Sequence, residues 1–301
     1  MSNARCLGCR LFRGWTHSPR AAAAAAASIV SAAAWLGKSI STCPLPPSQS
    51  RTLCDGKLLA RALPDDHRDT VRVRRVAADI IAAVREDRVF ERRRLSERTG
   101  HRVDHDIHWR VHVIIDDNWI CAFSIYNGEI VVYTGILRRY CRKDAHLATL
   151  LGHEVAHVIA RHTQRTYRMR FYIRVLAKCI EELLDAPVRG IPHAELVSLF
   201  MRPWHFSLEL EADRVGLMLL AAAGYDPRDA PSFYRALEPL DDPSDQYTLT
   251  ATHPSSKRRV EKLMMEHVMG EATKVFSQAV QWRMSPSGLR LKLPPAGREL
   301  V

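Results

Sequence analysis

Two histidines, His153 and His157, stand four residues apart, and Glu154 directly follows the first of them. The surrounding residues have helical periodicity, and four residues make one helical turn plus about 40°. Both imidazoles would therefore project from one face and could bind a single tetrahedral ion. Glu154 would lie beside that ion, where it could accept a proton from bound water and later give it to a leaving amine. This H-E-x-x-H spacing indicates zinc-assisted hydrolysis of peptide bonds.

The residues around this motif favour a metal site over a chance match. The chain has 14 histidines, so the alternative is a buried helix whose histidines only satisfy hydrogen bonds. The neighbouring apolar side chains would bury the helix in the dry setting that a catalytic metal needs. They are Leu147, Leu150, Leu151, Val155, Val158 and Ile159.

A third metal ligand is expected on another helix, because a catalytic zinc ion usually has three protein ligands and keeps a fourth position for water. Glu209 and Asp213 are four residues apart and share one helix face. Glu211 points about 200° away from Glu209, so only one of these glutamates can act together with Asp213. We assign Glu209 to the metal and Asp213 to a hydrogen bond with the outer nitrogen of a ligand histidine. Without the histidine motif, a solvated acidic face would be the better interpretation.

Helices and a small sheet are expected to position these residues. Apolar residues at helical spacing predict an amphipathic helix at 69–88. At 109–134 the apolar period changes to two, which predicts strands of a small antiparallel sheet. Asn127 and Gly128 predict a tight hairpin turn in which both residues adopt positive φ.

The histidine motif is expected within one helix at 143–166, with Asp144 as its cap. The helical pattern at 167–202 is interrupted by Gly and Pro residues, which are Pro187, Gly190, Pro192 and Pro203. The remaining predicted helices are 207–223, which ends at Gly224 as a C-cap, 230–237 and 257–280.

The positive charge of the chain is concentrated at its N-terminus. The net charge is +11, and six basic residues but no Asp or Glu precede Asp55. This Ala- and Ser-rich leader is typical of an organellar transit peptide, with a secretory signal as the alternative. Its apolar run at 21–36 is shorter than the roughly 20 residues that span a bilayer.

The cysteines and arginines argue against two classes of protein, a disulfide-stabilised secreted protein and a nucleic-acid-binding protein. Four of the seven cysteines lie in the leader, and the odd total argues against a disulfide-stabilised secreted protein. The others, Cys121, Cys141 and Cys179, are expected to be buried apolar residues. A nucleic-acid stacking platform requires aromatic residues between the basic ones, and the arginines at 92–98 have none. We therefore expect a solvated helix face there and no nucleic-acid partner.

Five motifs in order carry a resemblance to a known family. They are the strand pair at 122–123 and 128–132, the run at 151–162, the helix at 209–217, the turn at 224–227 and Thr252-His253-Pro254-Ser255. Over about residues 71–265 the chain resembles the zinc peptidases that include HtpX and the prenyl-protein proteases. It is most similar to the Oma-type metalloendopeptidases of the mitochondrial inner membrane. Several ordered motifs at suitable separations are more specific than any one alone.

The resemblance implies a mainly helical α+β fold of the gluzincin type, with a small antiparallel sheet packed by the H-E-x-x-H helix. It implies one Zn²⁺ per chain, held by His153, His157 and Glu209, with Glu154 as the catalytic base. His253 would stabilise the oxyanion, approach the metal in a resting state, or only pack its loop. The implied substrates are membrane-associated proteins, cleaved in quality control or stress-induced processing at the mitochondrial inner membrane or its surface. Peripheral membrane contact and homo-oligomerisation stay open.

Relatives add the substrate backbone to the edge strand that precedes the motif helix, here 119–125 or 130–134. Three departures from the family pattern bear on this interpretation. His205 and Phe206 stand where relatives carry Ser-Arg, which favours the alternative of a proteolytically silent homologue that binds membrane proteins or assembly factors. Charged residues between the two metal motifs argue against integral membrane insertion. The turn at 125–127 lacks the family's Pro-Gly, which bears on the shape of the hairpin.

The expected organisation has four parts. They are a transit peptide or disordered leader at 1–54, a linker and N-terminal amphipathic helical segment at 55–108, a zinc metallopeptidase domain at 109–282 and a loose C-terminal tail at 283–301. No internal repeat is visible.

Overall fold

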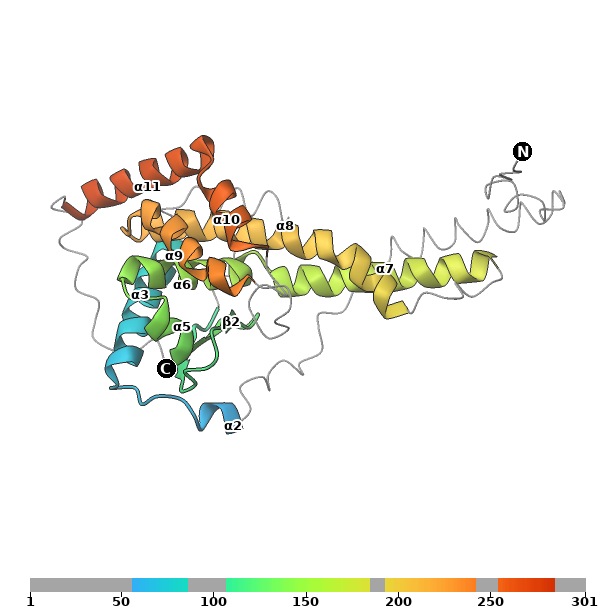
Figure 1. Ribbon diagram of the computed structural model, residues 1–301, viewed down its shortest axis with the longest axis horizontal. Coiled ribbons are helices and arrows are strands. Elements are labelled where there is room, and N and C mark those ends of the chain that lie inside the picture. Colours follow the sequence, from blue (N-terminus) through green and yellow to red (C-terminus); the bar gives the residue numbers. More distant parts are fainter. Residues whose placement is uncertain (1–55, 86–106, 185–192, 242–253, 285–301) are drawn as a thin grey trace, which may run out of the picture.

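The computed structural model describes residues 56–85, 107–184, 193–241 and 254–284 (Figure 1). Four predicted features lie outside these residues: the expected leader, the arginines at 92–98, Thr252 with His253, and the tail beyond residue 284. None of the helices in the described ranges has a stretch long and apolar enough to cross a membrane.

The described chain is mainly helical, with one small sheet. Its N-terminal half contains α2 (Gly56–Leu59), α3 (Arg68–Arg85), β1 (Arg110–Ile114), β2 (Ala122–Ser124), β3 (Glu129–Tyr133), α5 (Thr134–Arg139) and α6 (Asp144–Ile159). Its C-terminal half contains α7 (His162–Leu184), α8 (His193–Ala222), η3 (Pro227–Asp229), α9 (Ala230–Leu237), η4 (Glu238–Leu240), α10 (Ser256–Leu263) and α11 (Glu266–Met284). The α+β, mainly helical class expected from the sequence is confirmed.

Helix α6 lies at the centre of the body, between α3, the sheet, α8 and α9, whereas α7 and α8 run on together beyond the body (Figure 1). Twelve of its sixteen residues are buried, so the expected burial of the motif helix is confirmed. Helices α6 and α8 meet at two glycines. A Cβ atom on Gly152 would lie 2.9 Å from the carbonyl oxygen of Gly216, so only glycine permits this close approach. The crossing brings the motif face of α6 against the acidic face of α8.

The sheet is mixed, and the expected antiparallel arrangement is wrong for one of its two strand pairs. The strand order is β1-β3-β2. Strand β2 pairs antiparallel with β3, whereas β1 pairs parallel with β3, with Arg110 opposite Glu129 and Ile114 opposite Tyr133. A period of two marks a strand but contains no information about its partner or direction. Strand β3 is central, so 130–134 cannot be the edge that binds substrate, and β2 remains the candidate.

The hairpin turn between β2 and β3 differs from the expected two-residue turn. Gly128 has φ +96°, whereas Asn127 is not among the described residues with positive φ. The Gly128 amide donates to the carbonyl of Ile125 at 3.0 Å, and the Ile125 amide donates to Glu129 at 2.8 Å. These bonds define a three-residue loop with glycine in the left-handed region, the next most common hairpin connection.

The expected single helix at 143–166 is two helices. It breaks at Arg161, whose φ is +53°, and α7 starts at the next residue. Asp144 does not cap α6, because the N-cap is Lys143 and has no side-chain bond. The carboxylate of Asp144 instead pairs with Arg72 and Arg75 of α3, at 2.8 and 2.5 Å. These tertiary ion pairs compete with local capping.

Two other helix boundaries differ from expectation, and one agrees. Pro203 lies inside α8 and does not end it, so the packing of α8 outweighs a penalty of about 3 kcal/mol. The helix expected at 257–280 divides into α10 and α11 at residues 264–265. Gly224 does end α8, since its φ is +78° and the Tyr225 amide donates to the Leu220 carbonyl. This is the expected glycine C-cap.

Candidate metal centre

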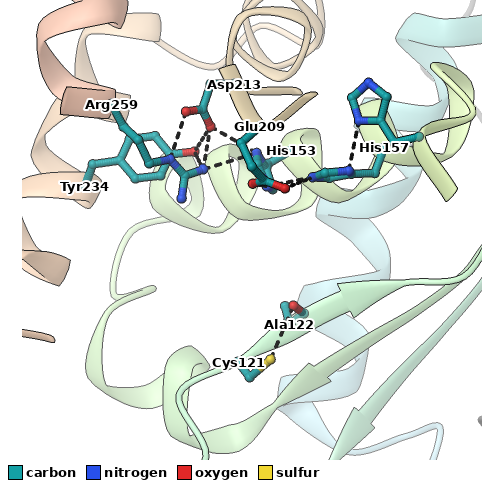
Figure 2. Close-up of polar contacts among 9 residues, drawn as sticks. Cys121, Ala122, His153, His157, Glu209, Asp213, Tyr234 and Arg259 are labelled. Atoms are coloured by element: carbon teal, nitrogen blue, oxygen red, sulfur yellow. Dashed lines mark hydrogen bonds and ion pairs between the residues drawn. The ribbon is translucent and has the colours of Figure 1, made fainter. Parts of the chain in front are cut away.

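Three side chains from two helices converge at the crossing of α6 and α8 (Figure 2). The Nε2 atoms of His153 and His157 lie 3.0 Å apart. Glu209 of α8 places one carboxylate oxygen 3.3 Å from Nε2 of His153 and the other 3.4 Å from Nε2 of His157. The sequence-derived candidates for a metal site therefore lie together, although Glu209 is more than fifty residues from the two histidines.

The spacing of these nitrogen and oxygen atoms fits a tetrahedral metal ion. Zinc binds histidine nitrogen and carboxylate oxygen at about 2.0–2.1 Å, and two corners of such a tetrahedron are separated by about 3.3 Å. The distance of 3.0 Å between the two Nε2 atoms, and the distances of 3.3 and 3.4 Å from them to different oxygens of Glu209, are close to that edge length. Two neutral imidazoles and one carboxylate are also the donor types that zinc prefers. This His-His-Glu cluster could therefore hold a metal ion.

A buried polar cluster orients His153 through its outer nitrogen. Nδ1 of His153 lies 3.0 Å from Oδ1 of Asp213, one turn of α8 beyond Glu209. Asp213 also accepts hydrogen bonds from Nε of Arg259 at 2.8 Å and from the hydroxyl of Tyr234 at 2.9 Å. The guanidinium of Arg259 stacks 4.0 Å from the centre of the Tyr234 ring (Figure 2). Because Nδ1 faces a carboxylate, it carries the proton, and Nε2 keeps its lone pair for a metal.

Charges in this cluster favour a cation at His153. Burial opposes ionisation of Asp213, but the Arg259 guanidinium holds the pKa of Asp213 well below its usual range. For His153, burial and the charge of Arg259 lower the pKa, yet bonds to Asp213 and Glu209 outweigh them and raise it to about 9. The two carboxylates thus stabilise positive charge on or beside this ring, whether it comes from a proton or from a metal ion.

A second buried chain of contacts orients His157. Its Nδ1 lies 2.9 Å from Nδ1 of His162, the first residue of α7. Nε2 of His162 faces Glu211 at 3.6 Å, and Glu211 accepts a hydrogen bond from Arg165 at 2.8 Å. Burial lowers the pKa of His162 to about 4, so the ring is neutral and can accept from Nδ1–H of His157. Helix α8 therefore supports both candidate ligand histidines, one through Asp213 and the other through Glu211.

Glu154 lies on α6 next to His153 and is buried, with 6% of its surface exposed. Helix α6 packs against β2, and Cys121 directly precedes that strand. Burial and the nearby negative charge of Glu154 raise the pKa of Cys121 to about 12. Cys141 is fully buried, and burial raises its pKa to about 12 as well. Cys141 is thus a buried apolar residue as expected, and Cys121 is half-buried; the side chain of Cys179 lies outside the described residues.

Some residues of this site have no clear sequence signal. The sequence predicts only that Glu211 points away from Glu209, and its contacts with Arg165 and His162 confirm that direction. His162 comes five residues after His157, so its proximity could have been proposed from local spacing. Arg259 contacts His153 across 106 residues of chain, and neither Arg259 nor Tyr234 belongs to a local pattern that includes the histidines.

A cavity of about 330 Å³ opens beside the cluster, between α7 and α8. Its lining includes both His157 and Glu209. The other lining residues are His162, Thr163, Thr166, Tyr167, Arg170, His205 and Leu208. His205 is therefore a cavity residue, and burial, followed by the charge of Arg170, lowers its pKa. Its neighbour Phe206 has the guanidinium of Arg258 4.1 Å from its ring centre.

The sequence also matches a known family of peptidases. Residues 91–267, more than half of the chain, match the family model of peptidase family M48. The chain therefore belongs to peptidase family M48, a family of metallopeptidases.

Several relatives of this chain are named as mitochondrial OMA1 metalloendopeptidases. The mitochondrial metalloendopeptidase OMA1 of Arabidopsis thaliana is 35% identical over 184 residues, which cover 60% of this chain and 36% of the relative. The human protein named "Metalloendopeptidase OMA1, mitochondrial" is 33% identical over 56% of this chain and 34% of its own length. The OMA1 protein of Schizosaccharomyces pombe is 30% identical over 67% of this chain and 54% of its own length. The chain thus spans between about a third and about half of the length of these relatives.

Proposed function

We propose that this chain is a zinc-dependent endopeptidase in which His153, His157 and Glu209 hold one zinc ion and Glu154 is the catalytic base. The observation that carries the proposal is the triangle of two Nε2 atoms and one carboxylate at 3.0–3.4 Å, at the crossing of α6 and α8. A zinc ion bound there would supply a water with a pKa near about 7 and would polarise the substrate carbonyl.

The protein's own residues account for the remaining steps. Glu154 accepts the proton of the attacking water and returns it to the leaving amine, a role worth about 10²–10⁴-fold in rate. Asp213, held by Arg259, keeps the proton of His153 on Nδ1, and His162 does the same for His157. The buried surroundings of Glu154 and His153 exclude bulk water from the proton transfer.

Strand β2 is the proposed docking edge for the substrate backbone. In the ladder with β3, the Ile125 amide donates to the Glu129 carbonyl and the Cys121 carbonyl accepts from the Tyr133 amide. Hydrogen-bonded positions alternate in an antiparallel pair, so Phe123 also bonds to β3, whereas Ala122 and Ser124 direct their amides and carbonyls to the free side. An extended substrate can add there as a further strand, close to Glu154. Such binding reads main chain rather than side chains, which suits an endopeptidase that cleaves unfolded or membrane-associated proteins.

We place this activity in the mitochondrion, at the inner membrane or its surface, in protein quality control or stress-induced processing. The support is the acid-free leader and the mitochondrial names of the relatives. A fluorescent fusion of the full chain should enter mitochondria, and deletion of residues 1–54 should abolish entry. A fusion that is secreted or stays in the cytosol would contradict this localisation.

The experiment for the activity compares the full chain with Glu154→Gln. Wild-type protein should bind one zinc per chain, measured by mass spectrometry of metals, and should cleave unfolded casein. Glu154→Gln should retain zinc and lose at least about 100-fold in cleavage rate. Equal cleavage by both proteins would refute the assignment of the base, and cleavage by the wild type after zinc removal would refute the role of the metal.

The second candidate is a proteolytically silent homologue that binds membrane proteins, and His205 with Phe206 is the observation that favours it. It predicts that wild type and Glu154→Gln both retain zinc and that neither cleaves casein. Against it, the structure places the guanidinium of Arg258 on the Phe206 ring, so an arginine still lies beside the position where relatives have one.

A further inference from the structure

The face of α7 beside the metal cluster is polar and carries one cation. After His162 at its start, α7 lines the cavity with residues at positions i, i+3, i+4 and i+7, which places them on one side of the helix. They are Thr163, Thr166, Tyr167 and Arg170. Tyr167 and the threonines offer hydroxyl groups, and Arg170 offers a guanidinium. Together with Leu208, this lining suits a side chain with an apolar stem and a negatively charged end.

Arg170 is available to bind a ligand. It is exposed, and within the described part of the chain no carboxylate forms an ion pair with it. By contrast, Arg165 on the preceding turn is committed to Glu211. Glu209 is the one acidic residue that lines the cavity, and its charge belongs to the metal cluster. Two neutral imidazoles and one carboxylate around a dication leave a net positive charge, which adds to that of Arg170.

The position of Arg170 fits a residue close to the scissile bond. About 12 Å of helix separates it from His162, which contacts a ligand histidine, and helical side chains lean toward the helix N-terminus. Arg170 therefore leans toward the metal end of α7. An extended substrate advances about 3.3 Å per residue, so a group bound by Arg170 lies within about three residues of the cleaved bond. The cavity of 330 Å³ has the volume of about ten waters, enough for one side chain.

We infer that Arg170 and the α7 face bearing it form a subsite for a carboxylate of the substrate, within about three residues of the scissile bond. The carboxylate belongs to an Asp or Glu side chain of the substrate or to its C-terminal end. This inference rests on the proposed peptidase function and adds a preference that backbone binding at β2 cannot provide.

The test uses quenched fluorescent peptides with Glu, Gln or Lys at each of three positions on either side of one scissile bond. Each peptide is made with a free or an amidated C-terminus. At the favoured position, kcat/KM of wild type should be about fivefold higher for Glu than for Gln, as for a partly exposed ion pair. Arg170→Gln should remove this ratio, Arg170→Lys should keep it, and Arg170→Glu should reverse it toward Lys. If only the free terminus matters, the carboxylate is the terminal one.

Arg174→Gln is the matched control. Arg174 stands one turn further along the same face of α7, is exposed and does not line the cavity. Arg174→Gln removes the same charge as Arg170→Gln but should keep the wild-type ratio of kcat/KM between the Glu and Gln peptides. Equal ratios in Arg170→Gln and Arg174→Gln, or a wild type without any preference, would overturn the subsite.

A binding measurement separates this inference from the peptidase proposal. Fluorescence anisotropy of labelled peptides on zinc-loaded Glu154→Gln should show tighter binding of the Glu than of the Gln peptide, with the difference lost when Arg170→Gln is added. Zinc removal should weaken the preference, since Glu209 then repels the acid. If no peptide is cleaved but this difference is present, the peptidase proposal fails and the subsite stands. If cleavage occurs but the difference is absent, the subsite fails alone.

Discussion

Gly152 and Gly216 are in backbone contact where α6 crosses α8. A Cβ atom added to Gly216 would lie 2.8 Å from the carbonyl carbon of Gly152 and from the amide of His153. The residue after Gly152 is a candidate ligand, and Gly216 is three residues beyond Asp213. The glycine contact therefore sets the distance between the histidines and the acidic face of α8.

Gly216→Ala should push the two helices apart. We expect a loss of about 1–3 kcal/mol in the free energy of unfolding, as for other overpacked cores, and a weaker zinc affinity because Glu209 moves away from the histidines. Urea unfolding and a competition titration with a zinc chelator measure the two effects. The control is Gly270→Ala on α11, where an added Cβ meets nothing within 4 Å, so it should be neutral or slightly stabilising.

Asp213→Asn should weaken both stability and zinc binding. The buried guanidinium of Arg259 would lose its counter-ion, which costs about 3–5 kcal/mol, and the bond to His153 would weaken, which raises the zinc Kd about 10–100-fold. Adding Arg259→Met should restore much of the stability, since no unpaired charge remains. If zinc affinity recovers together with stability, Asp213 acts through folding alone and does not orient His153.

His162→Leu should weaken zinc binding by about tenfold or more, because Nδ1–H of His157 loses its acceptor. The measurement is the same chelator competition, with thermal unfolding recorded in parallel. Thr163→Val is the comparison, since Thr163 is the next residue, lines the same cavity and does not contact a ligand histidine through any described hydrogen bond. Equal zinc affinities in the two variants would argue against the role of His162.

Asp144 should make the stability of the fold sensitive to acid. Burial raises its pKa, but bonds to Arg75 and Arg72 outweigh this and hold the pKa below its ordinary value of 3.8. A lowered pKa means that its contribution is present above about pH 4 and is lost as pH falls further. The difference in unfolding free energy between wild type and Asp144→Asn should be larger at pH 6 than at pH 3, and at pH 6 it should shrink in 1 M salt. A difference independent of pH would show that the ion pairs contribute nothing.

Ser124→Pro should impair substrate binding without unfolding the sheet. Position 124 directs its amide to the free side of β2, and proline is tolerated on an edge strand at such a position. Loss of one backbone donor should lower kcat/KM on unfolded casein roughly two- to tenfold, with little change in Tm. Phe123→Pro, which removes an amide from the ladder with β3, should instead lower Tm. Unchanged kcat/KM in Ser124→Pro would place the substrate elsewhere.

Local periodicity was sufficient to predict much of this molecule. Helix pitch alone placed His153 and His157 on one face, put Glu209 with Asp213, and turned Glu211 away from them. It also predicted α3, α9 and the glycine end of α8. These features depend on residues within a few positions of one another, and their geometry follows from about 100° of rotation per residue.

Only the tertiary structure decided which distant groups meet. Local spacing does not predict the parallel pairing of β1 with β3 or the partners of Asp144. It also does not predict the contact of Arg259 with Asp213 and His153. The reason is that strand direction, ion pairs and close helix crossings depend on packing between segments separated by tens of residues. Sequence spacing thus predicted which side chains could bind a metal together, and the contact of Gly152 with Gly216 is what brings their two helices close enough to do so.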